Sequence, residues 1–146
     1  MISFDSVNQA YGGTRILWDM NLDIAAGSVT CIMGRNGVGK TTLLKCLMGL
    51  IPAKEGAVKW ENQTITGFKP HQRVHAGIAY VPQGREIFGR LTVEENLLMG
   101  AYLKKDSDEV RTSIERIFEK YDRLKVRRSK PARVLSGGER RLLEIS

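Results

Sequence analysis

The sequence is poor in cysteine and has no apolar run near the eighteen residues of a membrane span. Its two cysteines, Cys31 and Cys46, exclude a disulfide framework, and their spacing is not that of a metal site. We expect both to be small apolar core residues. Because the cysteines are expected to be reduced and no secretory leader is seen, we also expect a cytosolic setting, with any membrane contact made through a partner.

Acidic residues are the minority, with 16 Asp and Glu against 23 Lys and Arg, for a formal net charge of +7. Much of the excess lies in residues 120–130. Aromatic residues do not alternate with these basic ones, as a stacking platform for nucleic acid requires. We interpret the run as a solvated helix end, with a binding patch as the alternative, and expect no direct contact with nucleic acid.

The hydrophobic pattern predicts an α/β protein of one domain's length, without internal repeats. The first half favours strands joined by turns, and the second half favours helices. Helix starts are marked by capping boxes at Thr92–Glu95 and Ser136–Glu139. The predicted strands are 2–7, 15–24 with a break at Asp19, 29–33, 57–60 and 78–81. The predicted helices are 42–48, 70–76, 92–99, 106–121 and 140–145.

Residues 34–41, GRNGVGKT, match the phosphate-binding pattern G-x-x-x-x-G-K-[ST] between a predicted strand and a predicted helix. Glycines allow positive φ and let main-chain N–H groups point inward at the start of a helix. Lys40 supplies a positive charge for the β- and γ-phosphates, and Thr41 supplies a hydroxyl for magnesium. The segment therefore predicts a triphosphate site, with an ordinary Gly-rich turn as the alternative.

Three segments in order resemble the ATPase subunits of ABC transporters: residues 34–41, 80–83 (YVPQ) and 135–139 (LSGGE). The resemblance covers the whole chain and implies a P-loop NTPase core with an N-terminal antiparallel β subdomain and a helical subdomain. Residues 34–45 and 84–88 are similar to the subunits of branched-chain amino acid and urea importers. The stretch 83–88 looks more like the urea type.

The resemblance also implies roles for individual residues. Gln83 matches the glutamine that positions magnesium and the attacking water, and Lys40 is its partner in catalysis; a plain surface glutamine is the alternative. Tyr11 matches the aromatic residue that stacks on adenine, and a packed tyrosine beside a turn remains open. The implied nucleotide-binding set is Tyr11, Gly34, Asn36, Gly37, Val38, Gly39, Lys40, Thr41, Thr42 and Gln83, with Thr41 and Gln83 on magnesium.

Ser136, Gly137 and Gly138 match the signature motif, which in the family binds the γ-phosphate of a nucleotide held by a partner subunit. An ordinary helix cap is the other interpretation, and the two are compatible. The family usually has glutamine where this chain has Glu139. An extra negative charge there would weaken a closed dimer.

The family pattern continues beyond what residues 1–146 contain. We expect a partial ABC ATPase domain, truncated before the strand that carries the magnesium-binding aspartate and the water-activating glutamate. Residues 1–82 would form the β subdomain and P-loop core, and 83–146 the Q-loop, helical subdomain and signature. We therefore expect negligible hydrolysis from this chain. Apolar strands without neighbours would leave surface exposed, so the chain is either clipped or self-associating.

The leading hypothesis is an importer subunit that binds ATP and Mg²⁺ and pairs with a second ATPase subunit and with membrane permease subunits. It would lie in the cytoplasm at the inner face of the membrane. The alternatives are a soluble ABC protein that acts on nucleic acid and a catalytically dead nucleotide-binding remnant. The histidines His71 and His75 share one helix face without a third ligand nearby, so we expect exposed side chains.

Overall fold

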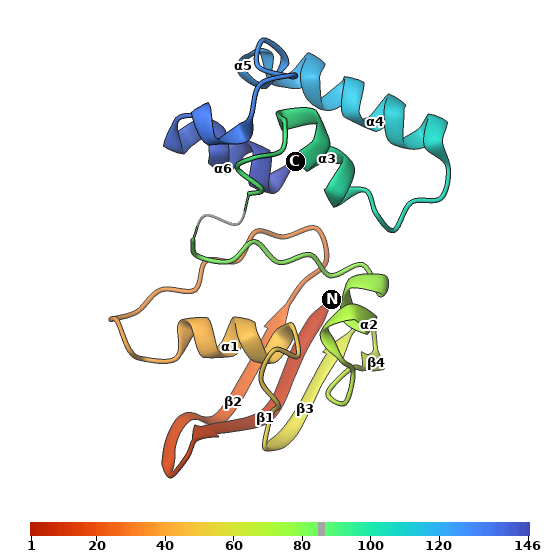
Figure 1. Cartoon of the computed structure of the whole chain (residues 1–146). Helices are drawn as coiled ribbons and strands as arrows, with labels where there is room; N and C mark the ends of the chain where they lie inside the picture. The colour runs from red at the N-terminus through yellow and green to blue at the C-terminus, as the bar shows by residue number, and fades with distance from the viewer. Residues whose placement is uncertain (85–86) are drawn as a thin grey trace. The chain divides into compact units, whose positions relative to one another are not determined.

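The computed structural model describes residues 1–84 and 87–146 (Figure 1). The chain forms two compact units, Met1–Tyr80 and Val81–Ser146. The first unit carries the strands and two helices, and the second is helical. The strands lie in the first half of the chain and most of the helices in the second, as the hydrophobic pattern predicts.

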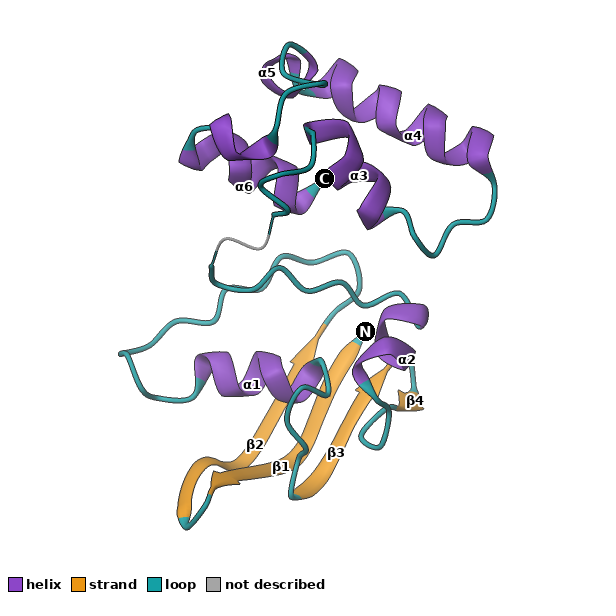
Figure 2. Ribbon diagram, in the orientation of Figure 1, coloured by secondary structure: helices purple, strands orange, loops and turns teal. Residues whose placement is uncertain are grey.

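The first unit is built on one antiparallel sheet with the strand order β2-β1-β3-β4 (Figure 2). The strands are β1 (Ile2–Tyr11), β2 (Thr14–Ile24), β3 (Glu55–Trp60) and β4 (Gln63–Thr64). A two-residue turn joins β1 to β2, and Gly12 adopts φ 57° there, which glycine tolerates best. The strands predicted over 2–7, 15–24 and 57–60 are confirmed.

The predicted break at Asp19 is a local irregularity inside β2. Asp19 has φ 41°, and Ser6, on the neighbouring strand, has φ 48°. Two asparagine side chains replace the missing ladder bonds: the N–H of Asp19 donates to Asn8 Oδ1 at 2.9 Å, and the N–H of Ser6 donates to Asn21 Oδ1 at 2.8 Å. Because these amides satisfy the displaced backbone, β2 continues across the bulge.

The predicted strands 29–33 and 78–81 are wrong, because neither segment is paired in the sheet formed by the described residues. An apolar run becomes a strand only when neighbouring strands satisfy its N–H and C=O groups. Val29 is consequently 101% exposed and Met33 83% exposed. Cys31, in the same segment, is exposed, so its predicted core position is also wrong, whereas Cys46 is buried as expected.

Two helices complete the first unit: α1 (Lys40–Leu47) and α2 (Pro70–His75). The helix α1 crosses one face of the sheet (Figure 2). Its buried residues Leu43, Cys46 and Leu47 join the sheet's Phe4 and Val58 in one apolar cluster. Both helices were predicted from sequence, and His71 and His75 on α2 are exposed, as expected.

The second unit consists of α3 (Val93–Gly100), α4 (Ser107–Lys120), α5 (Asp122–Lys125), the 3₁₀-helix η1 (Ala132–Val134) and α6 (Gly137–Ile145). The helices predicted near α3, α4 and α6 are confirmed, together with the caps at Thr92 and Ser136. The short α5 and η1 were not predicted. Ile114 and Phe118 of α4 lie in the core of this unit.

The basic run 120–130 is partly structural. The guanidinium of Arg128 pairs with Glu94 of α3 and, at 2.6 Å, with Glu115 of α4, and it lies 4.9 Å from the centre of the Phe118 ring. Lys125 and Lys130 are exposed, as a solvated helix end predicts. Arg128 therefore ties α3 to α4 as well as contributing to the surface charge.

Candidate functional site

The loop 34–41 has the backbone that the glycine pattern predicts. Gly34, Gly37 and Gly39 adopt φ values of 152°, 85° and 102°, in the region that disfavours side chains. At Gly39 space is also limiting, because a Cβ atom would lie 3.1 Å from Leu17 Cδ2 and 3.2 Å from Ile16 Cγ2. A glycine is thus required at position 39 both by conformation and by its contact with β2.

The N-terminus of α1 opens directly from this loop. Gly39 is its N-cap and contributes no capping side chain, and the first turn contains no acidic residue. The first N–H groups of a helix have no intrahelical partners and carry the positive end of the macrodipole. The loop and helix together therefore present a site for an anion.

Lys40 brings a full positive charge to the same place. Its ammonium donates to the carbonyl oxygens of Gly34 and Arg35, both at 2.7 Å, so the side chain folds back over the loop. An anion seated on the loop would compete with these two carbonyls for the ammonium, and the charge-assisted contact is the stronger one. The Lys40 ammonium is therefore available to an anion that binds on this loop.

The remaining predicted loop residues divide by exposure. Asn36, Val38 and Thr41 are exposed, whereas Thr42 is only 8% exposed. The Thr41 hydroxyl follows directly after the lysine, at the start of α1. Thr41 is thus the better placed of the two threonines to offer oxygen to a hard cation.

Tyr11 ends β1 beside the turn, paired with Thr14, and is 47% exposed. Nearly half of the residue's surface is in solvent, so the side chain is accessible to another aromatic group.

Gln83 and the signature residues belong to the second unit, whereas Tyr11 and residues 34–42 belong to the first. Gln83 is exposed, just after Pro82. Of the stretch 83–88, which resembles urea importers, residues 85 and 86 lie outside the described residues. The structure therefore brings together the loop and the start of α1 within the first unit, and Gln83 and the signature residues belong to the second.

The signature segment is a capped helix start. The hydroxyl of Ser136 accepts from the N–H of Glu139 at 3.3 Å, and the N–H of Ser136 donates to Glu139 Oε2 at 2.8 Å. Gly137 and Gly138 are exposed, and a Cβ atom at either would meet open space. Both interpretations of this segment, a helix cap and an exposed pair of glycine N–H groups, fit the geometry.

The unusual carboxylate at position 139 is compensated. Glu139 is 6% exposed, and its Oε1 lies 3.0 Å from Arg127 Nη1. Hydrogen bonds from Ser136, the backbone N–H first, lower the pKa of Glu139, and the charge of Arg127 lowers it further. The charge expected to weaken a closed dimer is therefore paired within the chain.

This arrangement predicts a pH dependence of stability. The pKa of Glu139 is depressed on folding, so its contribution is complete above the unfolded value of about 4.5 and is lost as the pH falls through the folded value. In urea unfolding followed by circular dichroism, the stability difference between wild type and Glu139→Gln should shrink from pH 7 to pH 3. Glu94 and Glu95, whose pKa values are also lowered, titrate in both proteins. A difference that stays constant would contradict the pairing.

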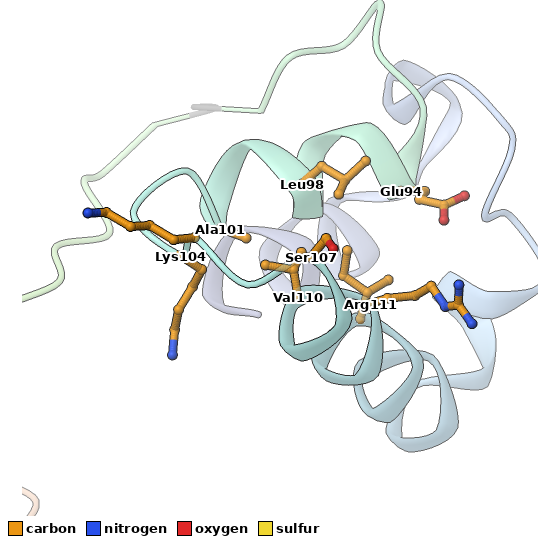
Figure 3. Close-up of a pocket in the computed structure, with 9 residues that line it drawn as sticks. Glu94, Leu98, Ala101, Lys104, Ser107, Val110 and Arg111 are labelled. Carbon is orange, nitrogen blue, oxygen red and sulfur yellow. The ribbon is translucent and has the colours of Figure 1, made fainter.

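A pocket of about 440 Å³ lies between α3 and α4, and sequence reasoning missed it (Figure 3). Leu98, Val110 and Ile114 provide apolar lining, and Lys104 and Arg111 add positive charge. Leu98 is 49% exposed. The sequence gives little indication of this pocket, because a leucine at helical spacing is interpreted as a core residue whether or not a partner helix covers it.

The described residues form no cluster of metal ligands and no membrane-spanning helix. No group of three or more His, Cys, Asp or Glu side chains is arranged to hold a metal ion there. Among the helices of residues 1–84 and 87–146, none has the length and apolar character needed to cross a bilayer.

The comparison with known proteins identifies the family. The model of the ABC transporter family matches residues 17–146. The chain is 38% identical to the branched-chain amino acid transport ATP-binding protein BraG of Pseudomonas aeruginosa, covering 99% of this chain and 62% of BraG. It is 39% identical to the probable LivF of Archaeoglobus fulgidus, covering 100% and 61%. It is 30% identical to the lipopolysaccharide export protein LptB of Haemophilus influenzae, covering 100% and 61%.

A solved structure supports the same conclusion. A nucleotide-free ATP-binding cassette from an ABC transporter superposes with a TM-score of 0.85 at 30% identity, covering 99% of this chain and 62% of that one. The chain belongs to the ABC transporter family, and the resemblance in its motifs is confirmed. It spans about three fifths of the length of the curated relatives that it matches.

Proposed function

We propose that this chain is the ATP-binding portion of an importer subunit of the branched-chain amino acid or urea type. Its identity to BraG and LivF, at 38% and 39%, exceeds its 30% identity to the exporter component LptB. The relatives named for branched-chain amino acids favour that solute class over urea.

The observation that carries the proposal is the start of α1, where the uncapped helix and the Lys40 ammonium meet at the glycine loop. The loop N–H groups and Lys40 would hold the phosphates. The exposed Thr41 hydroxyl and the Gln83 amide oxygen fit Mg²⁺, which prefers oxygen ligands. Magnesium, when bound, neutralises charge on the β- and γ-phosphates.

Isothermal titration of the full chain tests this proposal. Mg-ATP and inorganic tripolyphosphate should both bind, whereas AMP, which lacks the β- and γ-phosphates, should not. Equal binding of AMP and ATP would show that the base rather than the phosphate chain is recognised, and no binding of ATP or tripolyphosphate would reject the site.

Replacing Tyr11 with alanine should weaken Mg-ATP binding and leave tripolyphosphate binding unchanged. The exposed ring offers stacking to adenine, and aromatic stacking on a base contributes about 1–3 kcal/mol. Tyr11→Phe is the control that keeps the ring, and it should bind both ligands as wild type does. An equal loss of affinity for both ligands in Tyr11→Ala would show that the tyrosine acts through folding rather than through contact with adenine.

We further propose that two subunits sandwich the nucleotides, each presenting Ser136, Gly137 and Gly138 to the nucleotide of the other. The pairing of Glu139 with Arg127 supports this, because it removes a net negative charge from the helix start. Membrane permease subunits would dock on the helices after Gln83, where the pocket between α3 and α4 is open. The chain would then lie at the cytoplasmic face of the membrane.

For residues 1–146 by themselves we propose nucleotide binding without appreciable turnover. No residue among them matches the family's water-activating glutamate or its magnesium-binding aspartate. A positioned general base contributes about 10²- to 10⁴-fold to a rate. The ATPase activity is thus assigned to the complete family domain.

A further inference from the structure

Arg73, in the middle of α2, is a buried cation that is 2% exposed. Its guanidinium donates to four backbone carbonyls: Nε to Phe68 at 3.1 Å, Nη2 to Thr66 at 2.9 Å, and Nη1 to Cys46 at 2.7 Å and Leu47 at 2.5 Å. Burial lowers the pKa of this group. Among the described residues, main-chain oxygens rather than a carboxylate accept the hydrogen bonds of this guanidinium.

Two of these carbonyls belong to the last residues of α1. The final carbonyls of a helix lack the i+4 partners of its interior and carry the negative end of its macrodipole, so a buried guanidinium is a strong cap for them. The Cys46 oxygen also accepts from the N–H of Gly49 at 3.1 Å. The other end of α1 opens from the phosphate loop at Gly39. Eight residues at helical rise span about 12 Å, so the two ends belong to one short, stiff element.

The contact requires space that a glycine provides. Gly49 has φ 67°, and a Cβ atom there would lie 2.8 Å from both Arg73 Nε and the Phe68 oxygen. At the opposite end, Gly39 lies against Ile16 and Leu17 of β2. The helix is therefore fixed by β2 at its phosphate end and by Arg73 at its far end.

We propose that Arg73 is a positioning residue for the phosphate-binding loop. By holding the last carbonyls of α1, it fixes the direction of the helix whose first N–H groups, together with Lys40, receive the triphosphate. That the ligand is a triphosphate rests on the proposed function, whereas the effect of Arg73 on the direction of α1 does not. A stiff element that is bonded at both ends transmits a change at one end to the other.

Three variants of the full chain test this role. Arg73→Met removes the charge and every donor, and Arg73→Lys keeps the charge but loses the forked geometry. Arg128→Met is the matched control, because it removes an arginine with three side-chain partners in the other unit. Arg73→Met should bind Mg-ATP and tripolyphosphate about tenfold more weakly, with equal losses for the two ligands. Arg73→Lys should lose less, and Arg128→Met should bind as wild type does.

A second readout separates positioning from general stability. In ¹H–¹⁵N spectra recorded without nucleotide, the amide resonances of Gly39, Lys40 and Thr41 should move in both Arg73 variants and stay in place in Arg128→Met. Unchanged affinity in folded Arg73 variants, or resonance changes confined to Cys46–Gly49, would overturn the proposal. If Arg73→Met does not fold, Arg73→Lys decides by the same criteria. If wild type binds neither ligand, the proposed function fails, and the ligand-free spectra still decide the role of Arg73.

Discussion

Replacing Lys40 with alanine is expected to weaken Mg-ATP binding by about a hundredfold or more. The ammonium now donates to the Gly34 and Arg35 carbonyls and would pass to phosphate oxygens when nucleotide binds. Hydrogen bonds to charged groups contribute about 1.5–3 kcal/mol each, so the loss of two such contacts suffices for this effect. Isothermal titration of the two proteins under identical salt conditions measures it.

Lys45→Ala is the matched control, since Lys45 lies in the last turn of the same helix. It removes one positive charge from α1 without touching the loop, so its affinity for Mg-ATP should stay close to that of wild type. A folded Lys40→Ala protein that binds as tightly as wild type would remove Lys40 from the site. Equal losses of Mg-ATP affinity in Lys40→Ala and Lys45→Ala would show that only the net charge of the protein matters, and not the position of Lys40.

Replacing Phe118 with alanine is expected to destabilise the helical unit by about 3–5 kcal/mol, the cost of truncating a buried phenylalanine. Phe118 is completely buried among the apolar residues of α3, α4 and α6, and the Arg128 guanidinium lies over its ring. Urea unfolding monitored by far-ultraviolet circular dichroism should report the loss. Mg-ATP binding should persist, because the phosphate loop belongs to the other unit.

Arg116→Ala provides the control for this change, since Arg116 is exposed on the same helix. Its effect on unfolding should be small, because alanine favours helix and no buried surface is lost. If Phe118→Ala abolished nucleotide binding while the protein stayed folded, the assignment of the loop to an independent unit would be wrong.

The helices were predictable because their signals are local. A cap residue with an acidic partner three positions later marks the starts of α3 and α6, and an apolar stripe marks α4. The structure adds a local cap for α4 as well, because the Asp106 side chain accepts from the N–H groups of Asp108 and Glu109. The positive φ values of the glycine loop were predictable for the same reason, because the whole motif lies within residues 34–41.

The strands that failed depend on partners distant in sequence. Nothing within residues 29–33 says whether a neighbouring strand will satisfy their backbone, so an apolar run was misinterpreted and Cys31 with it. Pairs across long separations were equally hidden. Arg73 meets Cys46 from 27 positions away, and no sequence rule links a basic residue to main-chain carbonyls at that distance.

In the candidate site, the motif predicted which residues form the loop but not how they are held. The return of the Lys40 ammonium to the loop carbonyls and the pairing of Glu139 with Arg127 became visible only in three dimensions. The sequence predicts that the negative charge of Glu139 would weaken a closed dimer. The structure shows that Arg127 pairs with this carboxylate, so it is not an isolated charge.

The most direct measurement is a ¹H–¹⁵N titration of the full chain with Mg-ATP. The amides of Gly37, Gly39, Lys40 and Thr41 should shift together along a single saturable curve, while those of α4, in the other unit, change little. Saturable binding that leaves these four amides in place, or no binding at millimolar nucleotide, would contradict the assignment of residues 34–41 as the phosphate-binding loop.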